Sequence, residues 1–131
     1  MTSKASKVLI IGGGFSGMAA AIELRRQGVE VDLVEIDTEA IAKGRRLSYL
    51  IDHLVLNEKD EIIGTIEDLI VDDHHKLFAV LEVGDFLHRG SGPLIAIPYD
   101  RLSIDEERLT IRLPGASREK LNKVPVFEYR R

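Results

Sequence analysis

The sequence contains no cysteine, and its apolar runs are short. Without cysteine the chain can form no disulfide, thiolate metal site or cysteine nucleophile, and it is compatible with a reducing compartment. The first apolar run, residues 8–11, is too short for the core of a signal peptide or for a membrane span. We therefore expect a soluble, cytoplasmic protein with no membrane span.

An excess of positive charge is also missing. The chain has 18 Lys and Arg residues against 22 Asp and Glu residues, a formal net charge of −4. This balance disfavours general electrostatic binding to nucleic acid or anionic lipid, so no nucleic-acid partner is expected. The 131 residues suit one domain, or one small domain with an appendage, because compact domains usually contain about 100–150 residues. A complete flavin enzyme does not fit this length.

A glycine-rich stretch near the start, residues 11–17 (IGGGFSG), lies between two elements of predictable type. Before it, the β-branched apolar run is typical of a buried parallel strand. After it, apolar residues recur at helical spacing over residues 15–27, and Gly28 ends the helix. A second apolar strand then leads to Glu35. The order predicts a βαβ unit.

Four residues of this unit fit the requirements of a dinucleotide site. Gly12 would allow the tight turn, Gly14 would let the backbone approach a pyrophosphate, and Gly17 would let the helix pack closely on the strand. Glu35 would accept hydrogen bonds from a ribose. The start of the helix offers free N–H groups and the positive end of its dipole to the phosphates.

Residues 6–37 closely resemble the amino-terminal FAD-binding βαβ unit of FAD-dependent monooxygenases and related flavoproteins. The resemblance implies that Glu35 corresponds to the residue that binds the adenosine ribose. One βαβ unit supplies only two parallel strands, however, and no second unit follows. We therefore expect an incomplete motif in which FAD is the candidate cofactor, and no bound cofactor is expected for a monomer.

The sequence pattern changes after Asp37. Residues 38–48 (TEAIAKGRRLS) are polar and predict a linker or a marginal helix. Short strands joined by Gly and Asp turns then favour a small closed barrel over a sandwich; they are expected at residues 54–56, 62–66, 69–71, 77–83, 94–98 and 108–113. In the last strand we expect Leu109, Ile111 and Leu113 to point inward. Ser117 is expected to cap a short C-terminal helix.

Several segments in order resemble the signatures of the PRC-barrel family: residues 61–72 (EIIGTIEDLIVD), 79–87 (AVLEVGDFL), 94–100 (LIAIPYD) and 121–127 (LNKVPVF). The resemblance covers about residues 47–129. Asp85 stands where the family commonly has a second glycine, and Tyr99 where it commonly has tryptophan. The resemblance implies a mainly β fold, a small PRC-type β-barrel with a short C-terminal helix. It also implies a role in assembly and protein contact without catalysis.

The predicted organisation is a Rossmann-like βαβ fragment at residues 1–37, a linker at 38–48 and a PRC-barrel domain at 49–131. The four histidines lack the spacing of metal ligands, and the adjacent acids are typical of solvated turns, so no metal ligand and no catalytic residue is assigned. The loop at residues 87–93 is the candidate partner contact, to be tested by alanine at Phe86, Leu87 and Arg89.

The sequence thus predicts a non-catalytic PRC-barrel protein that acts as a small protein-binding or assembly module with an unidentified protein partner. The alternative is an FAD- or NAD(P)-binding protein, or an oxidoreductase component, whose site is completed by oligomerisation or by a partner chain. Two exposed apolar strands need a cover, so a homo-oligomer is part of this alternative. A third interpretation makes residues 1–40 the passenger of a gene fusion or a misread start.

Overall fold

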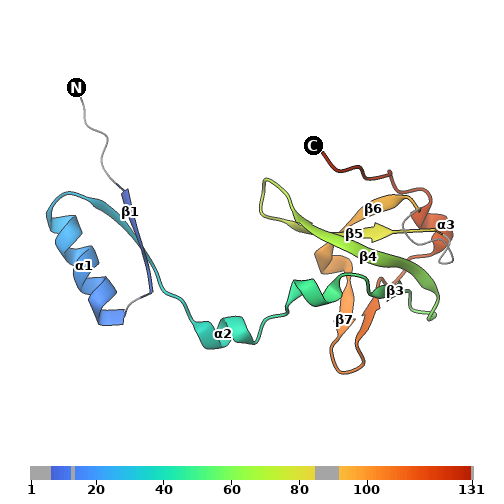
Figure 1. Cartoon of the computed structure of the whole chain (residues 1–131), viewed down its shortest axis with the longest axis horizontal. Helices are drawn as coiled ribbons and strands as arrows, with labels where there is room; N and C mark the ends of the chain where they lie inside the picture. The colour runs from blue at the N-terminus through green and yellow to red at the C-terminus, as the bar shows by residue number, and fades with distance from the viewer. Residues whose placement is uncertain (1–6, 13, 85–91, 131) are drawn as a thin grey trace. The chain divides into compact units, whose positions relative to one another are not determined.

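The computed structural model describes residues 7–12, 14–84 and 92–130. The chain divides into two compact units, residues 1–45 and residues 46–131. Each unit has its own secondary structure (Figure 1). Each is described separately below.

The first unit contains the predicted βαβ arrangement, followed by one short helix. Its elements are β1 (Lys7–Ile11), α1 (Gly14–Arg26), β2 (Glu30–Val34) and α2 (Thr38–Ala42). Strands β1 and β2 are parallel, with Leu9 in register with Asp32. Helix α2 begins where the Asp37 side chain accepts a hydrogen bond from the N–H of Ala40 at 3.1 Å.

Only one face of the β1–β2 pair is covered within this unit. Ile10 lies on the covered face, because a Cβ atom at Gly17 of α1 would lie 3.5 Å from its Cγ2 atom. The opposite face carries three exposed apolar side chains, Leu9, Ile11 and Val34. Parallel strands are normally buried on both faces, so this unit lacks part of the layer structure that its strands require.

The second unit is a six-stranded sheet with the order β6-β5-β4-β3-β8-β7. Its strands are β3 (Leu54–Leu56), β4 (Ile62–Val71), β5 (Leu77–Glu82), β6 (Leu94–Pro98), β7 (Ser103–Asp105) and β8 (Thr110–Arg112). The β3–β8 pair is parallel, and every other neighbouring pair is antiparallel. The described residues of this unit also include the 3₁₀ helices η1 (Leu47–Leu50) and η3 (Tyr99–Arg101).

A bulge bends the longest strand. The sequence predicted separate strands at residues 62–66 and 69–71, but the structure has the single strand β4. Ile66 pairs with Leu81 and Asp68 pairs with Val80, so Glu67 is an extra residue in β4. An extra residue increases the local bend and twist of a strand, which lets β4 follow the curved surface of a barrel.

One hydrophobic core holds the second unit together. Buried side chains from five strands and from α3 (Arg118–Leu121) form one cluster, and Ile97 of β6 and Ile104 of β7 pack against it. These two strands stand at opposite ends of the sheet order, so the sheet curls around a common core. The predicted small β-barrel, the short C-terminal helix and the preceding βαβ fragment are confirmed.

The expectation for Leu109 was wrong. Ile111 and Leu113 are buried, but Leu109 is 75% exposed and precedes the short strand β8. The chain reverses between Asp105 and Thr110, and Leu109 has a φ of +51° in this turn. A left-handed residue breaks the alternation of a strand, so its side chain leaves the inward row.

Candidate functional site

The glycine turn leads from β1 into α1 and is hydrogen-bonded to the end of β2. Gly12 follows β1 with a φ of +68°, and its N–H donates a hydrogen bond of 2.6 Å to the carbonyl of Val34. Val34 ends β2, and Glu35 is the next residue. The turn and the exposed Glu35 therefore follow neighbouring strands at the carboxyl edge of the sheet, where α/β proteins place their ligands.

Gly17 permits a close approach of backbone to backbone. A Cβ atom at Gly17 would lie 2.6 Å from the carbonyl oxygen of Gly12, closer than side-chain carbons approach such an atom. Gly14 begins α1 with a φ of +50°, and a Cβ atom there would meet no atom within 4 Å. Position 17 thus needs glycine because there is no space for a side chain, and position 14 needs it because of the backbone conformation.

The residues at this turn are suited to the phosphates and a ribose of a dinucleotide, but not to its redox-active ring. The start of α1 presents backbone N–H groups, which are the partners that a pyrophosphate requires, and Glu35 is exposed to a ribose. The sheet of this unit contains two strands in the described residues. A nicotinamide or isoalloxazine ring needs further strands and loops, so the unit supplies at most the phosphate and ribose contacts.

The second unit has an open groove of about 580 Å³ between the β3 region and the β7–β8 hairpin. We call it the β3–β8 groove. Most of its lining is apolar and comes from Ile51, Leu54, Leu56, Ile62, Leu109 and Ile111. The polar or charged residues of the lining are Asp52, His53, Asp60 and Thr110. Leu54 and Leu109 are 47% and 75% exposed, so apolar surface faces solvent here.

The backbone around this groove is unusual. The described part of the chain has four non-glycine residues with positive φ, and three of them, Asp52, Asp60 and Leu109, line the groove. Aspartate tolerates this conformation, but for a residue as bulky as leucine it is uncommon and strained. Strained residues concentrate at functional sites, where the surrounding structure holds them in place.

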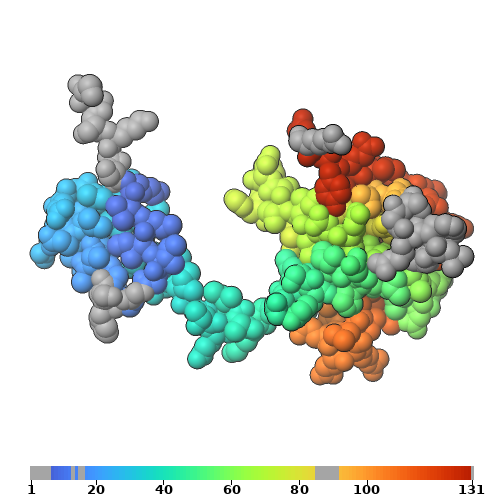
Figure 2. Space-filling model, in the orientation of Figure 1, coloured from blue at the N-terminus to red at the C-terminus, as the bar shows by residue number. Residues whose placement is uncertain are grey.

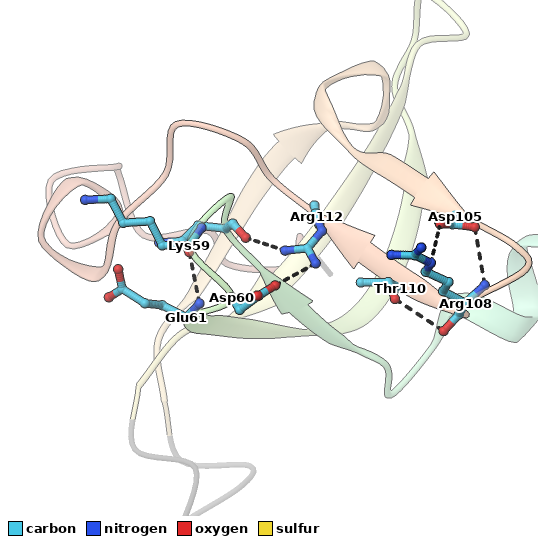
Figure 3. A network of polar contacts seen from close by, with 8 residues as sticks. Lys59, Asp60, Glu61, Asp105, Arg108, Thr110 and Arg112 are labelled. Atoms are coloured by element: carbon cyan, nitrogen blue, oxygen red, sulfur yellow. Dashed lines mark hydrogen bonds and ion pairs between the residues drawn. The ribbon is translucent and has the colours of Figure 1, made fainter.

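Hydrogen bonds and ion pairs hold this backbone. The N–H of Asp52 donates to the carbonyl of Ile66 at 2.7 Å. Arg112 lies 2.6 Å from a carboxylate oxygen of Asp60 and also donates to the Asn57 carbonyl at 2.8 Å (Figure 3). In the hairpin, the Asp105 carboxylate accepts hydrogen bonds from two turn N–H groups. These contacts fix the backbone on both sides of the groove.

The C-terminal segment crosses the other end of the sheet. The N–H of Phe127 donates to the Leu94 carbonyl at 2.7 Å, and the Tyr129 hydroxyl donates to an Asp68 carboxylate oxygen at 3.1 Å. Burial and the bond to Asp68 raise the pKa of Tyr129 to about 12. The hydroxyl therefore stays protonated and can donate at any physiological pH.

The remaining residues that the sequence singled out have simpler settings. Residues 72–76 form the β4–β5 turn, in which Asp72 accepts hydrogen bonds from the N–H groups of His74 and Lys76. Among the described residues, no group of three or more His, Asp or Glu side chains is placed to hold a metal ion. Phe86, Leu87 and Arg89 lie outside the described residues. No helix in the described ranges is long and apolar enough to cross a membrane.

Sequence reasoning did not identify the β3–β8 groove. Its strained positions depend on turn conformations that the strand alternation conceals, and Leu109 was assigned to the core for this reason. One signal was available: residues 105–108 read DEER between two short apolar stretches, which is typical of a hairpin turn. A turn there would have moved Leu109 out of the strand.

The chain thus combines a small β-barrel that has one core with a preceding βαβ fragment. Comparison with family models identifies the parts: the PRC-barrel domain matches residues 43–118, and an NAD(P)-binding Rossmann-like domain matches residues 10–49. The PRC-barrel match covers more than half of the chain, so the chain belongs to the PRC-barrel family. A search of curated proteins found no match to it.

Proposed function

We propose that this chain is a non-catalytic PRC-barrel protein that acts in the cytoplasm as a small protein-binding or assembly module. In this proposal residues 49–131 are the binding domain, residues 38–48 the linker and residues 1–37 the Rossmann-like fragment. The observation that carries it is the β3–β8 groove, at whose rim the exposed Leu109 is held in a left-handed conformation.

The groove has the properties of a protein-binding surface. Most of its lining is apolar, as in the buried part of protein interfaces, and two acidic residues, Asp52 and Asp60, also line it. Backbone hydrogen bonds fix its shape in the free protein, which reduces the entropy cost of association. An exposed leucine costs free energy in water, and burial in a partner recovers it.

Replacing Leu109 with asparagine is expected to abolish partner capture without unfolding the barrel. Asparagine adopts positive φ readily, so the turn is retained and the free energy of unfolding changes by less than about 1 kcal/mol. The apolar contact between the Leu109 side chain and the partner is lost. The measurement is quantitative co-purification of proteins with the tagged full chain from the source cells, together with urea unfolding of both forms.

The matched control for this experiment is Val71→Asn. Val71 is 57% exposed at the end of β4 and does not line the β3–β8 groove. The substitution Val71→Asn removes a comparable exposed apolar side chain from the same domain, so this variant should still capture the partner. A partner captured equally by the wild type, L109N and V71N would show that binding does not use this groove.

The alternative function is dinucleotide binding, with FAD or NAD(P) as the cofactor, at a site completed by oligomerisation or by a partner chain. The observation that favours it is the glycine turn: Gly12 and Gly14 have positive φ, Gly17 packs against the backbone of Gly12, and Glu35 follows the end of β2. The residues fit the phosphates and a ribose. A bound cofactor would supply redox chemistry that the chain's own side chains lack.

Calorimetric titration with FAD and with NADH separates the two functions. If the protein is a binding module without a cofactor, titration of the folded protein with either dinucleotide should give no saturable heat. The alternative predicts saturable binding that Gly14→Val abolishes, because a β-branched residue at a φ of +50° is strained and obstructs the phosphate position. Gly28→Val is the control: it imposes similar strain at a φ of +80°, but at the opposite end of α1.

A further inference from the structure

The first unit is too small to bury a core by itself. In its described part only two apolar side chains are buried, Ala21 and Val31. Folding units below about 40–60 residues usually need a disulfide, a metal or a partner, and this chain has no cysteine. A two-stranded sheet is also marginally stable in water. Additional strands would stabilise this unit.

The two edges of the sheet differ in their protection against pairing. Strand β2 reads EVDLV and carries Glu30 and Asp32, which are both exposed. Charged residues on an edge strand discourage pairing with another strand. Strand β1 reads KVLII, and its only charge, Lys7, already forms an ion pair of 3.0 Å with Asp32. In the described residues β1 pairs with β2 alone, so its outer edge is the unprotected one.

Self-pairing has opposite consequences for the two strands. An antiparallel pair of β2 strands centred on Asp32 would place two carboxylates directly opposite each other, which destabilises strand pairing. An antiparallel pair of β1 strands centred on Leu9 places Leu9 opposite Leu9 and Val8 opposite Ile10. Apolar β-branched pairs of this kind stabilise a sheet. The charge pattern therefore selects β1 and a second copy of the same strand.

We propose that the protein forms a two-fold symmetric dimer in which β1 pairs antiparallel with β1 of a second copy. The result is a four-stranded sheet with the order β2-β1-β1-β2, with both α1 helices on one face. Its contact is isologous, as expected for a symmetric dimer. The proposal concerns the first unit and does not depend on the binding role of the barrel.

The dimer would also add a residue to the glycine turn. In the register centred on Leu9, Lys7 of the partner subunit lies opposite Ile11, the residue before Gly12. The partner's lysine, whose ammonium is paired with Asp32 of its own chain, would then also stand beside a turn suited to phosphate, and its aliphatic stem would cover the exposed Ile11 side chain. Each copy would complete one phosphate site of the other.

A single introduced cysteine tests the register, because the chain contains none. In Leu9→Cys the two Cα atoms of an antiparallel pair would lie about 4.5–5.5 Å apart, within disulfide range. We expect mild oxidation to link most of the full-length protein into covalent dimers. The control is Asp32→Cys, at the position of β2 in register with Leu9. Its copies would be separated by three strand spacings, about 14 Å, and should stay unlinked.

Solution mass tests the association without oxidation. The wild type should sediment as a dimer, and Leu9→Arg should raise the dissociation constant at least about tenfold, because two arginines would face each other. Leu9 is 57% exposed in the free unit, so this change removes no buried contact within the unit, and any loss of α1 dichroism should accompany dissociation of the dimer. A wild-type monomer at 100 µM, or equal cross-linking of L9C and D32C, would overturn the proposal.

Discussion

Replacing Asn57 with alanine is expected to lower the free energy of unfolding of the barrel by about 2–4 kcal/mol, because several buried polar groups lose their partner at once. Asn57 is 2% exposed. Its side-chain oxygen accepts hydrogen bonds from the N–H groups of Lys59 and Glu61 at 2.9 and 3.0 Å, and its amide donates to the Ala116 carbonyl at 3.1 Å. One side chain therefore joins the β3–β4 turn to the segment before α3.

The measurement is urea unfolding of the full chain, with the midpoint and slope compared between variants. Asn122→Ala is the matched control, because Asn122 is exposed at the end of α3 and the same change there should cost less than about 0.5 kcal/mol. Asn57→Asp keeps the acceptor but places a carboxylate against the Ala116 carbonyl, so it should also destabilise. Equal midpoints for N57A and N122A would contradict a structural role for Asn57.

Local rules were sufficient to predict the first unit. The strand-turn-helix-strand order follows from apolar periodicity, and the helix ends before Gly28 because the φ of +80° there is suited to glycine. The cap at Ser117 is equally local: its hydroxyl accepts a hydrogen bond from the N–H of Lys120 at 3.2 Å. Features of this kind depend on a few neighbouring residues, so a single sequence contains the necessary information.

The parts that escaped prediction depend on distant contacts. Strand β7 has only three residues and forms because β8 pairs with it, so its own sequence gives little signal. The bulge at Glu67 depends on how β4 pairs with β5. Likewise, the positive φ of Asp52 accompanies a hydrogen bond to Ile66 across the fold. The β3–β8 groove is built from such positions, whereas the glycine turn is continuous in sequence.

Replacing Ile66 with alanine is expected to be the most destabilising of the substitutions considered, at about 2–5 kcal/mol for the loss of a buried isoleucine side chain. Ile66 is completely buried in the core of the barrel. It also stands immediately before the bulge, and its N–H donates to the His53 carbonyl at 2.9 Å. Ile66→Val is the matched control, because it removes one methylene group and should cost about 0.5–1.5 kcal/mol.

The same variant tests whether the two units unfold separately. All three tyrosines, Tyr49, Tyr99 and Tyr129, lie in the second unit, and the chain has no tryptophan. Tyrosine fluorescence therefore reports the barrel, whereas far-ultraviolet dichroism reports both units. In Ile66→Ala the fluorescence transition should fall by roughly 8–40 °C, since 1 kcal/mol shifts a domain of this size by about 4–8 °C. The contribution of α1 to the far-ultraviolet dichroism should be lost at the same temperature as in the wild type. A single transition that falls by the same amount in both signals would show one cooperative unit, with the Rossmann-like fragment stabilised by the barrel.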